Sequence, residues 1–142
     1  MKIRVSRRIA TWDRSLLPAA DFEFVVLADT HYMIDPGGGP VEFSSRRLQT
    51  ERAASAWEQV ASLECPHVFH LGDLVQEFPG TGDFSRAMTS AIEQFSRHGI
   101  SPHVVAGNHD IGDKPDPTMP TRPVTAGSLE DFHRVLGPSW YS

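Results

Sequence analysis

Three short apolar runs each end in side chains that commonly bind metal ions. The runs cover residues 24–28, 67–71 and 103–106. The side chains that follow them, in chain order, are Asp29 and His31, then Asp73, then Asn108, His109 and Asp110. If the runs are neighbouring parallel strands, their carboxyl ends share one edge of one sheet, where ligands gather in such folds. The repetition therefore predicts a divalent metal site of carboxylate, amide and imidazole groups at that edge.

The segments between these runs have the spacing of crossover helices. The chain reads as strand, helix, strand, helix, strand over residues 22–28, 45–63, 67–71, 83–99 and 102–106. Residues 22–28 are apolar at both alternating positions except for Glu23, which is typical of a strand covered on both faces. We expect Asp83 to cap the second helix and Gly99 to end it. Two right-handed crossovers would align all three strands in parallel, which predicts an α/β fold.

The chain changes character beyond Asp110. Prolines at positions 115, 117, 120 and 123 predict an irregular surface loop, because proline cannot donate to a regular ladder. Ser128, with Asp131 three residues later, resembles a capping box that would begin a last helix. Gly137 and Pro138 would end that helix.

Composition excludes several classes of function. The net charge of -5 argues against broad nucleic-acid binding, which calls for a basic face. No apolar stretch reaches the roughly 20 residues that cross a bilayer, so no membrane partner is expected. Cys65 is the only cysteine, so no disulfide can form within the chain and we expect a cytoplasmic location. Residues 1–21 lack a signal-peptide pattern and are expected to form an N-terminal extension or an extra strand.

Each candidate ligand also has an ordinary structural explanation. Asp29 and Asp73 follow strands, where aspartate often bonds nearby backbone amides. Asn108 could accommodate a left-handed turn, and His31 could be a surface loop residue. The metal hypothesis depends on the combination, because complementary ligand types recur at the ends of three successive strands.

The same motifs resemble those of a known family. In chain order they read Asp29-x-His31, Gly72-Asp73 and Gly107-Asn108-His109-Asp110. This series is similar to the first three motifs of the calcineurin-like metallophosphoesterases, and the similarity runs from residue 22 to residue 110. The resemblance implies a two-sheet sandwich flanked by helices, with a dinuclear metal centre at one edge. This chain would be the N-terminal half of that α/β domain.

The resemblance also implies a set of metal ligands. Asp29 and His31 would bind the first ion, Asp73 would bridge the two ions, and Asn108 would bind the second. A shared carboxylate can hold two cations about 3.5 to 4 Å apart. The cofactors would be two divalent ions of Mn, Fe, Zn or Ni, since oxygen and imidazole ligands suit all four.

The expected substrate is a small phosphomonoester or phosphodiester. His109 would face it and donate a hydrogen bond or a proton, with Asp110 favouring the charged form of His109. Two subclasses of the family are unlike this chain. Protein serine/threonine phosphatases carry Asp-Arg-Gly after the second motif, whereas this chain reads Leu74-Val75-Gln76-Glu77 there and ends its third motif in Asp110 instead of Glu. Purple acid phosphatases have a tyrosine at the position of Gln76.

The family completes its metal centre with a later single histidine and a Gly-His-x-His motif, and this sequence has neither. We therefore expect residues 22–142 to be a truncated calcineurin-like phosphoesterase domain. His67 and His70 do not replace those ligands and are expected to lie on opposite faces of their strand, in packing or edge roles. The alternative function is that of a non-catalytic fragment or binding module that keeps a partial metal site. The sequence leaves the oligomeric state open.

Overall fold

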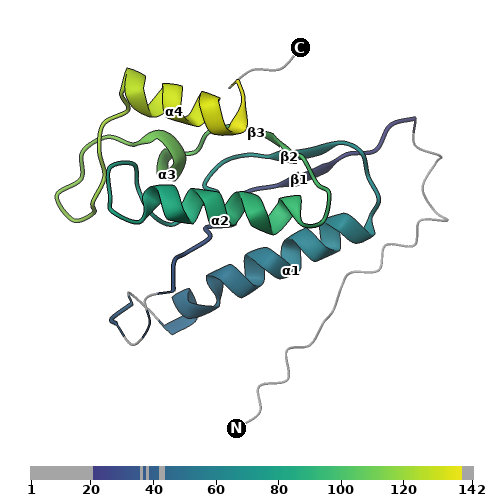
Figure 1. The fold of residues 1–142 in the computed structure, drawn as a ribbon, viewed down its shortest axis with the longest axis horizontal. Helices are drawn as coiled ribbons and strands as arrows, with labels where there is room; N and C mark the ends of the chain where they lie inside the picture. Colours follow the sequence, from purple (N-terminus) through teal and green to yellow (C-terminus); the bar gives the residue numbers. More distant parts are fainter. Residues whose placement is uncertain (1–20, 36, 38, 42–43, 139–142) are drawn as a thin grey trace, which may run out of the picture.

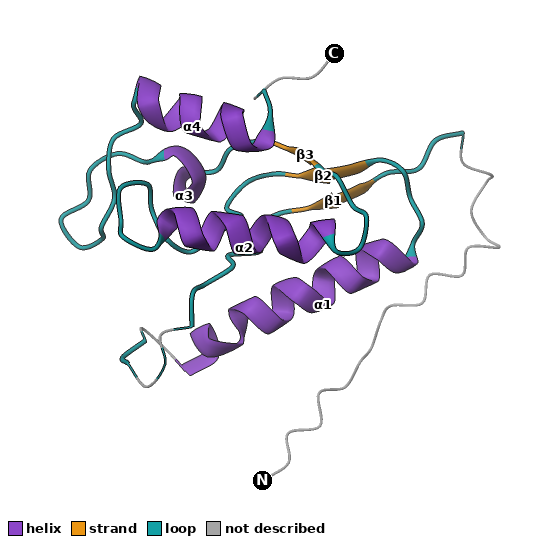
Figure 2. Ribbon diagram, viewed as in Figure 1, coloured by secondary structure: helices purple, strands orange, loops and turns teal. Residues whose placement is uncertain are grey.

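A three-stranded parallel sheet forms the centre of the molecule. The computed structural model describes residues 21–35, 37, 39–41 and 44–138. The sheet has the order β1-β2-β3, with β1 (Val25–Leu27), β2 (Val68–His70) and β3 (His103–Val104). The helices are the 3-10 helix η2 (Ser44–Leu48) and the α-helices α1 (Gln49–Ser62), α2 (Phe84–Ser96), α3 (Asn108–Ile111) and α4 (Ala126–Leu136). Figures 1 and 2 show α1 and α2 side by side along the sheet. The predicted α/β fold, with helices flanking a parallel sheet, is confirmed.

The strands are shorter than the apolar runs that predicted them. Val25 pairs with Val68, and Leu27 pairs with His70, which also pairs with Val104. Two residues after Leu27 the chain enters the left-handed region at Asp29, where φ is 55°. β1 ends early because this conformation departs from the extended geometry that a ladder needs.

Helices α1 and α2 cover one face of the sheet. The buried residues of α1 are Ala53, Trp57 and Val60, whose spacing of three and four places them on one helical face. Trp57 and Val60 pack in the same core as Val68 and Val104 from the strands, and α4 adds its own buried side chain, Phe132, to this core. These apolar positions therefore mark the face of α1 that packs on the sheet.

The opposite face of the sheet is exposed in the described part of the chain. Phe24 and Val26, at alternating positions of the first strand region, are 55% and 48% exposed. Val26 pairs with Phe69, so the two side chains share this face, and the nearby Leu71 and Val105 are exposed as well. The apolar pattern predicted cover on both faces, whereas the described residues cover only one.

The helix ends differ in detail from the sequence expectation. Asp83 occupies the N-cap position of α2 in a helical conformation, and its carboxylate pairs with Arg86 at 3.0 Å instead of capping the helix. Ser128 does not begin α4, because Thr125 is the N-cap and exchanges hydrogen bonds with Ser128 in a capping box. Gly137, with φ of 93°, ends α4 as predicted.

One expectation concerns a part of the chain beyond this description. The N-terminal extension or extra strand predicted for residues 1–21 falls, up to residue 20, outside the described residues. Within the described ranges, every helix is too short or too polar to span a bilayer.

Candidate metal centre

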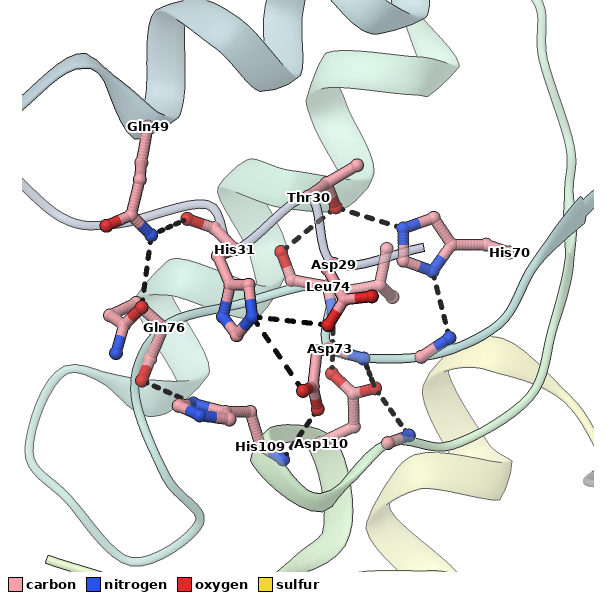
Figure 3. Close-up of polar contacts among 12 residues, drawn as sticks. Asp29, Thr30, His31, Gln49, His70, Asp73, Leu74, Gln76, His109 and Asp110 are labelled. Atoms are coloured by element: carbon pink, nitrogen blue, oxygen red, sulfur yellow. Dashed lines mark hydrogen bonds and ion pairs between the residues drawn. The ribbon is translucent and has the colours of Figure 1, made fainter. Parts of the chain in front are cut away.

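The first two motifs run side by side beyond the carboxyl ends of β1 and β2. The Asp29 N–H donates to the Gly72 carbonyl (3.0 Å), and the His31 N–H donates to the Asp73 carbonyl (3.0 Å). The Tyr32 N–H then donates to the Leu74 carbonyl (2.7 Å). These bonds extend the pairing of the two segments past the strands and fix the positions of both motifs at one edge of the sheet. Figure 3 shows the side chains of Asp29, His31 and Asp73 close together.

Three candidate ligands have left-handed backbone conformations. The φ angles are 55° at Asp29, 42° at His31 and 55° at Asp73, and among the described non-glycine residues only Glu64 shares this property. Aspartate and histidine enter this region more readily than most residues, although it still carries strain. Such conformations persist where surrounding bonds enforce them and are concentrated at functional sites. Here the interstrand bonds supply that constraint.

Two glycines allow the third motif to approach the second. A Cβ atom at Gly72 would overlap the backbone of Gly107, and a Cβ atom at Gly107 would overlap both the backbone and the carboxylate of Asp73. The close approach lets the His109 N–H donate to Asp73 Oδ1 at 2.9 Å. The glycines of the second and third motifs are therefore required by packing and not only by turn geometry.

A buried carboxylate holds these two motifs together. Asp110 is 2% exposed, and its Oδ2 accepts the N–H groups of Asp73 (2.8 Å) and Gly107 (2.9 Å), while its Oδ1 accepts that of Leu74 (3.0 Å). Burial raises the pKa of Asp110 to about 6, although the backbone hydrogen bonds act to lower it. From the sequence we expected this carboxylate to favour the charged form of His109, whereas in the structure it accepts hydrogen bonds from backbone amides.

The side chains of the first two motifs converge at a spacing suited to a shared cation. His31 Nε2 lies 3.6 Å from Asp29 Oδ1 and 3.7 Å from Asp73 Oδ2. These separations exceed the ~3.2 Å limit of ordinary N–H···O bonds. They are close to the roughly 3.0 to 3.4 Å expected between two donor atoms bound to one ion at about 2.1 Å. The donor set and its spacing therefore fit a divalent metal ion.

His109 joins this group from the third motif. One ligand atom each from His31, Asp73 and His109 lies within 4.8 Å of the others. The His109 Nδ1 lies 2.7 Å from the Gln76 carbonyl, which can only accept, so Nδ1 carries the proton and Nε2 has the free lone pair of the neutral ring. The ring stacks on Phe78 with centroids 4.0 Å apart. Burial lowers the pKa of His109, and the bond to Gln76 and the charge of Asp73 oppose this shift.

Comparison with known proteins agrees with this geometry. The model of the calcineurin-like phosphoesterase family matches residues 22–138. The chain belongs to the calcineurin-like phosphoesterase family. It is also 34% identical over 112 residues to Metallophosphoesterase 1 of Ailuropoda melanoleuca, a match that covers 71% of this chain and 27% of that protein. The chain thus spans about a quarter of the length of this curated relative.

Members of this phosphoesterase family are metal-dependent, and the structure brings most of the sequence-predicted residues together. Asp29, His31 and Asp73 meet at the sheet edge, as expected for neighbouring parallel strands. Asn108 begins α3, one residue before His109. His109 was expected to face the substrate, and its ring also lies among the candidate metal ligands. The role of each residue in the phosphoesterase reaction stays a prediction.

Sequence reasoning missed several hydrogen bonds that support this candidate site. Gln49 Nε2 donates to the His31 carbonyl (3.0 Å) and to Gln76 Oε1 (3.0 Å), which links α1 to the first two motifs. Thr30, the unspecified position of the first motif, bonds to His70. His70 has the same strand parity as the buried Val68, and this parity is the signal that could have placed it under the site.

Proposed function

We propose that this chain provides part of a divalent metal site for the hydrolysis of a small phosphomonoester or phosphodiester. The observation that supports it best is the convergence of His31 Nε2 with the carboxylates of Asp29 and Asp73 at 3.6 and 3.7 Å. Asp29 and His31 would hold one ion, Asp73 would be shared between two, and Asn108 would bind the second. Mn, Fe, Zn or Ni would suit this oxygen and imidazole set.

The chain's own residues would position the ions and the phosphoryl group. Ions bound here would supply Lewis acidity at phosphorus and a nucleophile from water. His109 keeps its Nδ1 proton bonded to the Gln76 carbonyl, so Nε2 would have to take up a proton before it could donate to a phosphoryl oxygen or to the leaving oxygen. Asp110 would not touch the substrate, because its carboxylate is bonded to three backbone amides. We therefore assign it a positioning role.

A pocket beside His109 would receive the rest of the substrate. It has a volume of about 900 Å³, which is in the range of small-molecule sites. Its lining combines apolar Ile34 and Phe78 with two arginines and three acidic residues, namely Arg46, Arg86, Asp35, Glu77 and Asp83. This mixed surface, together with the acidic net charge of the chain, favours a small phosphoester over a nucleic acid.

The test is hydrolysis of bis-p-nitrophenyl phosphate and p-nitrophenyl phosphate by the metal-stripped chain, with and without Mn²⁺. We expect turnover that depends on Mn²⁺ and that falls by at least about 100-fold in Asp73→Asn, because loss of a ligand should exceed the 10- to 100-fold effect of losing an outer partner. Asp131→Asn is the matched control, since Asp131 lies on exposed α4 and pairs only locally with Arg134.

A parallel calorimetric titration with Mn²⁺ separates the two candidate functions. Metal binding without turnover would favour the alternative of a non-catalytic binding module with a partial metal site. A chain that is folded and binds no Mn²⁺, or an Asp73→Asn variant that binds it as tightly as the parent, would overturn the proposed site.

A further inference from the structure

A buried chain of hydrogen bonds lies beneath the candidate metal ligands. His70, on the helix-covered face of β2, is fully buried at 0% exposure. The Gly72 N–H donates to His70 Nδ1 (3.2 Å), and His70 Nε2 lies 3.0 Å from Thr30 Oγ1. The Thr30 hydroxyl in turn donates to the Leu74 carbonyl at 3.4 Å. Figure 3 shows that these hydrogen bonds join the first motif to the second.

The direction of each bond follows from its partners. A backbone N–H can only donate, so His70 Nδ1 is the acceptor and Nε2 carries the proton. Nε2–H therefore donates to Thr30 Oγ1, which leaves the threonine proton for the Leu74 carbonyl. The arrangement requires a neutral imidazole, and burial lowers the pKa of His70 to about 4, which keeps the ring neutral near pH 7.

The position of the imidazole is fixed by packing as well. The ring stacks on Trp57 of α1, with centroids 5.8 Å apart and planes inclined by 25°. Trp57 is 1% exposed and belongs to the core beneath the sheet. The donor that reaches Thr30 is therefore held by the rigid part of the fold.

Thr30 lies between two candidate ligands that have strained conformations. Asp29 and His31 have φ angles of 55° and 42°, so the peptide groups on either side of Thr30 must stay in an unusual arrangement. The threonine side chain ties this turn to the buried His70 of β2 through a side-chain hydrogen bond. Without it, the turn would depend on the backbone bonds to the second motif and on the bond from Gln49 to the His31 carbonyl.

We propose that His70 and Thr30 are positioning residues that hold Asp29 and His31 in the geometry required for metal binding. The metal-binding part of this inference rests on the proposed function. Its structural part, the ordering of the first motif by the Thr30 hydroxyl, can be measured in the metal-free chain.

The first experiment compares Thr30→Val, which removes only the hydroxyl, with Thr30→Ser, which keeps it. Amide hydrogen exchange of the metal-free chain should be about tenfold faster at Asp29 and His31 in Thr30→Val and close to the parent rate in Thr30→Ser. The control is Thr89→Val, because Thr89 lies on the exposed side of α2 and its hydroxyl donates to the Ser85 carbonyl of the same helix. Exchange that is unchanged in Thr30→Val, or equally raised in Thr30→Ser, would overturn the inference.

The second experiment measures Mn²⁺ affinity by calorimetry. Thr30→Val should weaken binding by about 10- to 100-fold, as is typical for loss of a partner that orients ligands, and Thr30→Ser should restore it. If the parent itself binds no Mn²⁺, the proposed function fails, and the exchange measurement alone decides the positioning role.

A third comparison remains informative if Thr30→Val does not fold. In His70→Gln the side-chain amide can still donate to Thr30, whereas in His70→Asn the shorter side chain can only replace the acceptor for Gly72. We expect the Gln variant to bind Mn²⁺ at least about tenfold more tightly than the Asn variant. Equal affinities, or ring nitrogen NMR shifts that place the proton on Nδ1 in the parent, would overturn the inference.

Discussion

Asp110 shows how a charged side chain can act on a site without facing it. Its carboxylate receives backbone N–H groups from the second motif and from the start of the third, so it fixes the distance between them. The neighbouring His109 therefore lies at the sheet edge, where its backbone N–H donates to Asp73 Oδ1. The Asp110 side chain thus acts through the backbone.

This role predicts a large stability effect for Asp110→Asn. The amide has one acceptor oxygen, and its NH₂ group would face a backbone N–H, so at least one buried donor would lose its partner. We expect the free energy of unfolding in urea to fall by about 2 kcal/mol or more. Asp131→Asn, on the exposed surface of α4, should change it by less than about 0.5 kcal/mol. Equal effects would rule out the anchoring role.

His70 predicts a pH dependence of stability. Its pKa is lowered from 6.5 to about 4 in the fold, chiefly by burial, so the unfolded chain binds more protons between these values. The neutral ring therefore contributes stability that is fully present above about pH 6.5 and is lost as the pH falls toward 4, by up to about 3 kcal/mol.

Urea unfolding at about pH 7 and about pH 4.5 would measure this loss, with His70→Gln as the reference that cannot take up the proton. The parent should lose about 2 to 3 kcal/mol more than the variant between the two conditions. If both proteins lose the same amount, the protonation of His70 does not limit stability in acid.

The sequence predicted the residues that meet at the edge but not those that hold them. Asp29, His31 and Asp73 could be placed because strand ends in a parallel sheet share an edge. The partners of Asp110 could not, because they are backbone amides from another motif, and no residue type in the sequence marks a backbone donor. The bond between Thr30 and His70 was missed for a related reason, since it spans 40 positions in the chain.

At the scale of the elements, the second and third motifs can touch because Gly72 and Gly107 have no side chains. The segment after β2 and the segment before α3 approach so closely that Gly107 lies against Asp73. Larger residues in either segment would separate the two loops and move the candidate ligands apart.

Gly107→Ala should therefore damage the site. The added methyl group would overlap Asp73, and relief of that overlap must move the proposed bridging ligand. We expect the free energy of unfolding to fall by about 2 kcal/mol, with a parallel loss of Mn²⁺ affinity in calorimetry. Gly82→Ala is the control, because a Cβ atom there meets no atom within 4 Å. A Gly107→Ala variant that matches this control would contradict the packing argument.

The element boundaries were predictable only in part. The apolar faces of α1 and α2 repeat at three and four, and the structure confirms both helices. The sequence placed the start of α4 three residues late. Thr125 has an extended backbone and caps the helix with its side chain, while the Ser128 side chain accepts a hydrogen bond from the Thr125 N–H. Ser, Thr and Asp are all favoured at the N-cap, so the local sequence does not show which of the nearby residues of these types begins the helix.

The whole molecule has two unlike sheet faces. Val68, His70 and Val104 are buried beneath α1 and α2, whereas Phe24 and Val26 on the other side are about half exposed. A contiguous exposed apolar surface of this kind is unusual for an isolated soluble domain.

This asymmetry predicts binding of a fluorescent dye that reports apolar surface. Phe24→Ser and Val26→Thr should lower the dye signal while changing the free energy of unfolding by less than about 1 kcal/mol, because both side chains are largely exposed. Val124→Thr is a control of similar exposure in the loop before α4 and should leave the signal unchanged. A signal that responds equally to all three variants would place the dye elsewhere.

The strands lie in the sheet in the same order as in the chain. Because a polypeptide leaves the ribosome from its N-terminus, β1 and β2 can pair before the third strand has been made. The edge that carries Asp29, His31 and Asp73 would then exist in the nascent chain, and His109 would arrive last. An ion bound at the proposed site at that stage would stabilise the pairing of β1 with β2.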